Sequence, residues 1–293
     1  MAEFRGDQAS GLRRLLGRPP LRVVTFAAGS NDVGKSVAVT NLAMLLARTG
    51  REVLIVDENT STIASYFGAT ALYDLQQVVN RRRTLAEVIV SLGHGIRLLP
   101  TAGVTARLAS LNVMEQQILL QSLAELQPAV DVVLVDTSLD HPLGFSPFGL
   151  AAHETVIVMA PNGTAITESY ALIKKVSLGY ARKHFRILIN RTRSDDEAHA
   201  IFDNIAQVSH SRGLARLDYV GHIPLDERLR QASRLCQPVV GLFPDSPAAR
   251  AYQAMANELL DWPTDPEVNG GLEHFIQQLL HLSQRIDPIA IYA

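Results

Sequence analysis

The stretch FAAGSNDVGKSVAV, residues 26–39, decides the fold of this chain. From Gly29 to Ser36 it has the spacing G-x-x-x-x-G-K-S of a phosphate-binding loop. An apolar run, Val23–Ala27, precedes the loop, and a helical pattern, Ser36–Arg48, follows it. In a strand–loop–helix unit of this kind, backbone N–H groups and the helix N-terminus bind an anion. We therefore favour a phosphate site over a chance match in a strand–helix turn.

Short apolar runs rich in Val and Ile recur along the chain, with helical patterns between them. The runs are Val23–Ala27, Val53–Val56, Ile96–Leu99, Val132–Val135, Thr155–Met159, Ile187–Ile189 and Tyr219–Val220. The intervening helical patterns include Met114–Leu126, Thr164–Gly179 and Asp196–Arg212. Buried parallel strands have this continuous apolar character, and right-handed crossovers connect them. The pattern predicts an α/β fold with a doubly wound, mainly parallel sheet and helices on both faces.

Composition narrows the class of protein. The 293 residues are 47% hydrophobic and 19% charged, which is typical of a globular chain. With a net charge of -2 the chain has no excess of positive charge, so no direct nucleic-acid binding is expected. The single cysteine, Cys236, has no internal disulfide partner, and no apolar run is long enough to span a bilayer. We expect a cytoplasmic protein.

Three segments are expected. Residues 1–20 end in Pro19-Pro20 and form an N-terminal segment, residues 21–262 form the nucleotide-binding core, and residues 263–293 form a linker and a last helix. The core would bind ATP or ADP with Mg²⁺.

The expected phosphate and metal contacts involve four residues, of which Lys35 meets phosphate and the other three would hold the metal. Lys35 would reach the β- and γ-phosphates, and the Ser36 hydroxyl would hold Mg²⁺. Asp57 and Asp136 each end an apolar strand, where a carboxylate can hold a metal-bound water. The alternative is that these two acids only cap the turns that follow.

On these residues the chain resembles the MinD/ParA class of phosphate-loop ATPases and, within it, the flagellar number regulators of the FlhG/FleN type. The resemblance runs over nearly the whole chain. It rests on DQASGLR (7–13), TLAEVI (84–89), GIRLLPTAG (95–103), DVVLVDT (131–137), TESYALIK (167–174), FRILIN (185–190), YVGHIPLDERLRQA (219–232), the FP…AY stretch (243–252) and GLEHFIQQL (271–279).

This resemblance implies control of the number and placement of flagella. The implied partners are the GTPase FlhF, flagellar switch-ring proteins and a flagellar transcription activator. The family's N-terminal segment stimulates FlhF, and the matching positions here are Asp7, Gln8, Leu12 and Arg13. Leu12, Leu15 and Leu16 can form one apolar stripe beside arginines. The alternative for this segment is a frayed basic tail.

The resemblance also assigns nucleotide contacts, and the loop departs from the family pattern. The expected contacts are Gly29, Ser30, Asn31, Asp32, Val33, Gly34, Lys35, Ser36, Asn190 and Pro224. The family typically reads K-G-G-x-G-K-T, and its first lysine crosses a dimer interface. Here Ser30, Asn31 and Asp32 replace that lysine and two glycines, which removes a cation and adds Cβ atoms and a carboxylate. Whether two copies of the chain form a homodimer when nucleotide is bound stays open.

The catalytic positions depart as well. The family reads D-x-D, where the second aspartate orients water, and this chain reads Asp57-Glu58-Asn59. Asn59 can hold a water but cannot accept its proton, so with Lys35 it forms a weakened catalytic pair. We expect weak or conditional ATP binding and slow or absent hydrolysis. Asn190 aligns with an adenine contact of the family, and its alternative is a plain turn residue.

The last helix, Leu272–Ile286, has an apolar face formed by Leu272, Phe275, Ile276, Leu279 and Leu280. In MinD-like proteins this helix is a membrane anchor. Its polar face has almost no lysine or arginine here. Two alternatives are therefore equally open: the helix binds lipid at the inner face of the membrane, or it docks on a protein surface.

Two rival functions remain. One is a working MinD/ParA-type ATPase that positions DNA or a secretion apparatus, and the other, weaker, is a biosynthetic enzyme such as an amidoligase. The nine histidines show no ligand spacing, so no further metal is expected. The basic cluster NRRRT, Asn80–Thr84, is either a solvated surface or a contact for a partner.

Overall fold

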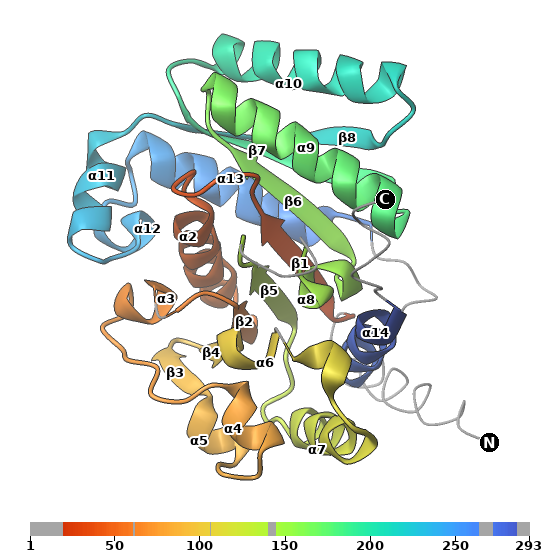
Figure 1. The fold of residues 1–293 in the computed structure, drawn as a ribbon. Helices are drawn as coiled ribbons and strands as arrows, with labels where there is room; N and C mark the ends of the chain where they lie inside the picture. The colour runs from red at the N-terminus through yellow and green to blue at the C-terminus, as the bar shows by residue number, and fades with distance from the viewer. Residues whose placement is uncertain (1–19, 61, 106, 140–144, 264–271, 286–293) are drawn as a thin grey trace.

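A single sheet organises the computed structural model, which describes residues 20–60, 62–105, 107–139, 145–263 and 272–285. Its strand order is β3-β4-β2-β5-β1-β6-β7-β8 (Figure 1). Every neighbouring pair is parallel except β3 and β4. The strands are β1 (Arg22–Ala27), β2 (Val53–Asp57), β3 (Val90–Gly93), β4 (Ile96–Pro100), β5 (Val132–Asp136), β6 (Glu154–Met159), β7 (His184–Thr192) and β8 (Arg216–Pro224).

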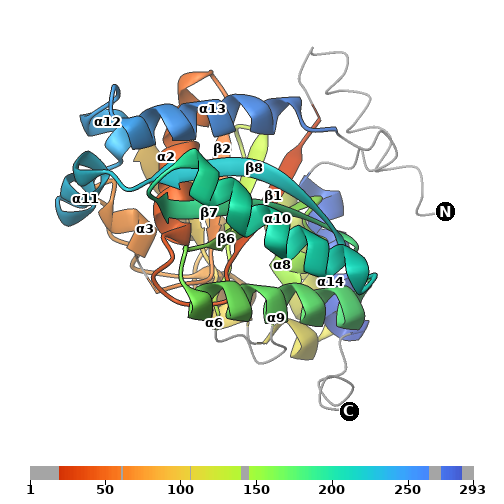
Figure 2. The same cartoon turned by 90° about the horizontal axis from the view of Figure 1, so that it is seen from above.

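Helices cover both faces of this sheet. In Figure 2, α2 and α13 lie on one side, and α9 and α14 lie on the other. The longer helices are α2 (Lys35–Arg48), α7 (Val113–Ala124), α9 (Gly163–Tyr180), α10 (Asp195–Ser211), α11 (Glu227–Arg234), α13 (Pro247–Asp261) and α14 (Leu272–Arg285). The short ones are α3 (Thr62–Ser65), α4 (Leu75–Val79), α5 (Leu85–Val88), α6 (Ala102–Thr105), the 3₁₀ turn η1 (Leu108–Ser110), α8 (Pro147–Ala151) and α12 (Val239–Leu242). The doubly wound fold is confirmed.

The apolar runs of the sequence account for most of this sheet. Each of the seven runs lies within a strand, and every residue of β1, β2, β4 and β5 is buried. Strand β3 is absent from the sequence-based expectation. It has four residues, is largely unburied and pairs antiparallel at the edge of the sheet. Short half-exposed edge strands lack the continuous apolar pattern by which buried strands are found.

The strand register brings the candidate acids together. Asp57 on β2 and Asp136 on β5 are direct partners in the parallel ladder. On the other side of β5, Phe26 of β1 pairs with Asp136, one residue before that strand ends. The loop that follows β1 therefore starts beside both carboxylates. This is the carboxyl edge of a parallel sheet, where open α/β folds bind their ligands.

The C-terminal helix α14 packs against the body of the protein. Phe275 and Leu279 on α14 are 1% and 0% exposed. The Phe275 ring lies 6.4 Å from that of Phe148 on α8, centroid to centroid. Of the two alternatives for its apolar face, the structure shows docking on protein. Within the described residues, no helix is both long enough and apolar enough to cross a bilayer.

Candidate nucleotide site

The loop between β1 and α2 is shaped by two glycines. At Gly29 a Cβ would lie 2.3 Å from the backbone of Glu168 and Ser169 on α9, so a side chain is excluded there. Gly34 has φ 90° and caps the N-terminus of α2, and a Cβ on it would lie 2.1 Å from the Asn190 amide nitrogen. Both positions require glycine for physical reasons. The backbone thus adopts a tight turn into the helix N-terminus.

Asn190, at the end of β7, ties this loop to the sheet. Its amide nitrogen donates to the Val33 carbonyl over 2.7 Å, and its oxygen accepts from the Arg191 N–H over 2.9 Å. The side chain is 3% exposed. Its contact in this structure is with the phosphate loop itself, and contact with adenine stays a prediction.

Lys35 and Ser36 both contact Asp136. The Lys35 ammonium forms an ion pair with one carboxylate oxygen of Asp136, and the Ser36 hydroxyl donates to the other over 2.6 Å. Lys35 is 9% exposed and Asp136 0% exposed, so the pair is shielded from water. These are the residues that the motif predicts for phosphate and metal. The structure brings them together.

Asn59 lies between the two acids. Its amide nitrogen donates to Asp57 Oδ1 over 3.3 Å, to Asp136 Oδ2 over 3.0 Å and to the Asp136 carbonyl over 3.1 Å. Burial, followed by the charge of Asp136, raises the pKa of Asp57 to about 7, although hydrogen bonds from Asn59 oppose the shift. The amide therefore supplies positive dipole to a carboxylate pair that would otherwise repel. Asn59 has no basic group that could accept a proton from an attacking water molecule.

Glu58 is a buried acid whose role the sequence did not indicate. Its two oxygens accept from the Ser138 N–H over 3.0 Å and from the Ser146 hydroxyl. Burial raises its pKa to about 7. Ser146 is also the N-cap of α8. One side chain thus joins the end of β2 to the segment after β5 and to α8.

The three unusual loop residues differ in their surroundings. Asn31 and Asp32 are exposed, and Asp32 has φ 59°, a left-handed conformation that favours glycine. The Asp32 carboxylate can therefore be hydrated, which moderates the expected repulsion of phosphate. The Ser30 hydroxyl is buried and has no hydrogen-bond partner within the described residues. An unpartnered buried hydroxyl in a phosphate loop fits a ligand oxygen.

A pocket of about 490 Å³ opens beside Gly34. Asn190 and Pro224 both line it, together with Val37, Leu225 and Leu229. The structure thus places two distant parts of the chain, both expected to contact nucleotide, at one apolar pocket next to the phosphate loop. Its size lies in the range of small-ligand sites.

The remaining candidate residues lie elsewhere. Asp7, Gln8, Leu12 and Arg13 lie outside the described residues. Leu272, Phe275, Ile276, Leu279 and Leu280 lie on α14, and the last four are buried in the docked helix. Their contact with lipid stays a prediction and would require α14 to leave its site.

Fold and site together define a phosphate-loop nucleotide-binding protein of the MinD/ParA kind. Residues 24–239 match the CobQ/CobB/MinD/ParA nucleotide binding domain, and the chain belongs to this family. MinD from Aquifex aeolicus superposes with a TM-score of 0.64 at 19% identity, covering 83% of this chain and 98% of that one. MinD complexed with Mg-ADP from Pyrococcus horikoshii gives a TM-score of 0.58 at 20% identity, with coverage of 82% and 96%.

The similarity to a flagellar regulator is closer in sequence. The antiactivator FleN of Pseudomonas aeruginosa is 31% identical over 263 residues, which cover 89% of this chain and 94% of FleN. The resemblance stated from the sequence motifs is thus confirmed.

Proposed function

We propose that this protein regulates flagellar number and placement through nucleotide-linked contacts with partner proteins. The observation that carries the proposal is its 31% identity to the antiactivator FleN across almost the full length of both chains. The candidate site supports it, because Lys35, Ser36, Asp57, Asp136 and Asn190 are kept, while the position expected to orient the attacking water carries Asn59. The output of such a protein is a binding state and not a product.

ATP or ADP with Mg²⁺ fits the residues present. Gly34 and Lys35 would hold phosphate oxygens, and Ser36, Asp57 and Asp136 would hold the metal. The buried, unpartnered Ser30 hydroxyl supports this fit. Bound Mg²⁺ would neutralise phosphate charge. Lys35 must leave its ion pair with Asp136 to meet a phosphate, so nucleotide and this internal pair compete.

Hydrolysis is expected to be slow or absent. Asn59 uses its amide nitrogen on Asp57 and Asp136 and carries no group that accepts a proton from water. The second candidate function, an active MinD/ParA-type ATPase that positions another cargo, rests on the superposition with MinD. The test is the ATPase rate of purified protein beside its Lys35→Ala variant. A clear rate that is lost in the variant would favour the second function.

A chain of contacts leads from the site toward the surface. Glu58 follows Asp57 directly and holds Ser146 at the start of α8, and Phe148 of α8 packs on Phe275 of α14. A change at the carboxyl ends of β2 and β5 can therefore reach α14. This supports contact with partners or with a membrane surface that depends on nucleotide. A nucleotide-linked homodimer is the weaker alternative, because Ser30 replaces the lysine that would link the two subunits.

The expected partners are FlhF, flagellar switch-ring proteins and a flagellar transcription activator. We expect the first twenty residues, through Asp7, Gln8, Leu12 and Arg13, to stimulate the FlhF GTPase. The experiment measures GTP hydrolysis by FlhF with a peptide of residues 1–20 and with an Arg13→Glu peptide. Stimulation by the first and not by the second supports the proposal. No stimulation by the peptide or by the full chain would overturn this part.

The lipid alternative for α14 has a separate test. Anionic liposomes are sedimented with the wild-type chain and with a chain ending at Gly271, each with and without ATP and Mg²⁺. Stronger pelleting of the wild type with nucleotide is the expected result if α14 is released. Equal pelleting in all four mixtures would leave α14 as a structural helix.

A further inference from the structure

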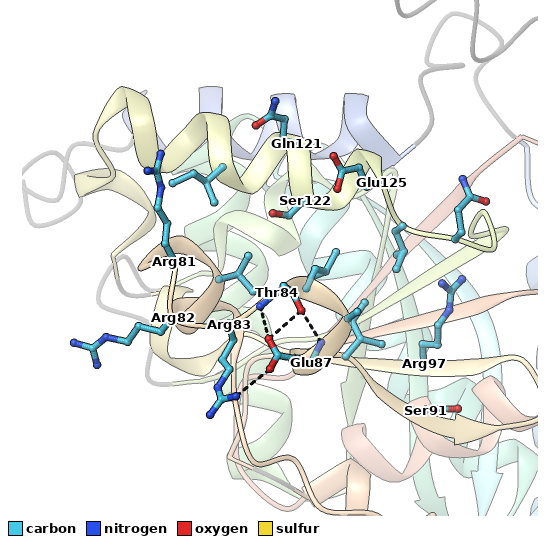
Figure 3. A pocket seen from close by; sticks show the side chains of 17 residues that line it. Arg81, Arg82, Arg83, Thr84, Glu87, Ser91, Arg97, Gln121, Ser122 and Glu125 are labelled. Atoms are coloured by element: carbon cyan, nitrogen blue, oxygen red, sulfur yellow. Dashed lines mark hydrogen bonds and ion pairs between the residues drawn. The ribbon is translucent and has the colours of Figure 1, made fainter.

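A groove with a volume of about 970 Å³ lies between α7, the turn after α4, α5 and the edge strand β3 (Figure 3). It is distinct from the nucleotide site. Arg97, which lines it, is the second residue of β4 and lies at the amino end of that strand, whereas Asp57 and Asp136 end theirs. No residue of the phosphate loop lines the groove.

The charges along the groove are mainly positive. Arg81, Arg82, Arg83 and Arg97 line it, against Glu87 and Glu125. Arg83 is already engaged, because it pairs with Glu87 over 2.9 Å and lies over the ring of Tyr73. Arg81 and Arg82 are exposed, and no side-chain partner is recorded for either within the described parts of the chain. Subtracting the Arg83–Glu87 pair, and the pair that Arg97 forms with Glu52 outside the groove lining, leaves Arg81 and Arg82 facing the single carboxylate of Glu125.

The turn that carries these arginines is held in place by its backbone. The N–H groups of Arg81, Arg82 and Arg83 donate to carbonyls of α4 at 2.9, 2.8 and 3.2 Å. Arg81 also has φ 56°, a left-handed conformation that is unfavourable for a residue with a Cβ. The cations are thus presented from a fixed turn, and Figure 3 shows Arg81 beside α7 at the opposite end of the groove from Arg97.

Arg97 has two buried side-chain donor atoms without an acceptor among the described residues. It is 9% exposed, donates from Nη2 to the Pro128 carbonyl over 2.6 Å and lies 3.6 Å from Glu52 Oε2. Its Nε and Nη1 atoms are buried and have no hydrogen-bond partner within the described residues. Unsatisfied buried donors of a charged group are costly, and an incoming carboxylate would satisfy both.

The floor between the two ends is apolar. Leu85, Ile89, Ile118 and Leu126 line it, with Gln121 and Ser122 of α7 along one wall. A phosphate-rich ligand suits such an apolar floor poorly. A peptide that alternates acidic and apolar side chains meets both features, because its carboxylates reach the arginines and its apolar side chains cover the floor.

We propose that this groove binds an acidic, amphipathic peptide segment of a partner protein, with carboxylates held by Arg81 and Arg97. The site lies away from the nucleotide and adds a second recognition surface to the one proposed for residues 1–20. The inference does not depend on the flagellar role, because it rests on the groove alone.

The experiment measures fluorescence anisotropy of a labelled twelve-residue peptide that alternates Glu and Leu, titrated with the full chain at low salt. Its matched peptide replaces every Glu by Gln. The variants are Arg81→Glu with Arg82→Glu on the exposed turn, Arg97→Lys, which keeps the buried charge, and Arg250→Glu on α13 as an exposed control outside the groove.

We expect the wild type to bind the Glu peptide. The affinity should fall at least about tenfold in the Arg81/Arg82 variant and should also fall in Arg97→Lys, but Arg250→Glu should bind as the wild type does. ATP binding by all variants should match the wild type. No binding of the Glu peptide, equal binding of the Gln peptide, or equal binding by the Arg81/Arg82 variant would each overturn the proposal. Displacement of the peptide by micromolar inorganic tripolyphosphate would also overturn it in favour of a phosphate site.

Discussion

Asn59 changes the electrostatics of the candidate site. Its amide nitrogen is a hydrogen-bond donor to Asp57 and Asp136, which are neighbours in the β2–β5 ladder. An aspartate at this position would instead be a third carboxylate among buried groups. Each like charge at about 4 Å costs about 1 to 4 kcal/mol, depending on screening. The asparagine therefore stabilises the site when no metal is bound.

The first prediction concerns Asn59→Asp. The variant should unfold at a lower temperature than the wild type in EDTA, because the added charge is unpaired. Mg²⁺ should recover much of that loss by neutralising the cluster, so the difference in melting temperature with and without Mg²⁺ should grow. Asn59→Ala, which removes the donor but adds no charge, is the control. An Mg²⁺ response in Asn59→Asp no larger than in Asn59→Ala would contradict the prediction.

The second prediction concerns Asp32, which is exposed and has φ 59°. Asp32→Gly should increase ATP affinity several-fold, because it removes a negative charge near the expected phosphates and suits the left-handed backbone. Stability should change by less than about 1 kcal/mol, since relief of strain is offset by greater freedom of the unfolded chain. Calorimetric titration with ATP and Mg²⁺ measures the affinity. Asn31→Gly, at an exposed neighbour without charge, should have a smaller effect.

At the scale of elements, α14 and α8 connect the C-terminal region to the nucleotide site. The apolar face of α14 is buried against α7, α8 and η1. Its polar face has few cations, so its burial on protein and not in lipid is consistent with its charge. Release of this helix would expose the apolar side chains that now pack against α7, α8 and η1.

The third prediction tests how firmly α14 is docked. Leu279→Ala should lower the free energy of unfolding by about 2 to 4 kcal/mol, because Leu279 is 0% exposed and the truncation leaves a cavity. Denaturant unfolding measures the loss. His281→Ala, on the exposed face of the same helix, is the matched control and should change stability by less than about 0.5 kcal/mol. Similar values for both variants would show that the docked face contributes little.

The fourth prediction uses Glu58. Burial raises its pKa to about 7, above its unfolded value of 4.5, so the folded state binds the extra proton between these values. The contribution of Glu58 to stability is therefore greatest at low pH and falls as pH rises from about 4.5 to about 7. Glu58→Gln should flatten this dependence. Unfolding free energies at pH 5, 6, 7 and 8 check it, and an unchanged slope would show that Glu58 is ionised throughout.

At the scale of the whole molecule, the phosphate loop bears on oligomeric state. The position that carries a lysine in the resembling family holds Ser30, so the charge that would reach across a dimer to the partner's nucleotide is absent. Opposite charges across an interface increase association and specificity. We therefore expect weaker coupling between nucleotide binding and dimer formation in this chain than in family members that carry the lysine.

The fifth prediction follows. Light scattering of the wild type should give nearly the same mass with and without ATP and Mg²⁺, because the bridging charge is missing. The triple variant Ser30→Lys, Asn31→Gly, Asp32→Gly should shift toward a dimer when ATP is added. Lys35→Ala in the triple variant should abolish that shift. A wild type that dimerises fully with ATP would overturn the argument.

Most of the fold could be predicted from the sequence because its signals are local. Continuous Val- and Ile-rich runs identified seven of the eight strands, and the spacing from Gly29 to Ser36 identified the phosphate loop. Strand β3 was missed, because a short, half-exposed edge strand leaves no such run. The candidate acids Asp57 and Asp136 were predictable because each ends a buried strand of the same parallel sheet.

Only the tertiary structure decided which residues far apart in the chain contact one another. Asn59 bonds to Asp136, 77 residues away, and Glu58 to Ser146, 88 residues away. The docking of α14 and the unpaired donors of Arg97 in the groove likewise depend on which surfaces meet after folding. The sequence by itself determined seven of the eight strands, the phosphate loop and the family, because periodicity and motif spacing act over a few residues. It left open what each polar side chain contacts, because burial and hydrogen bonding are properties of the packed chain.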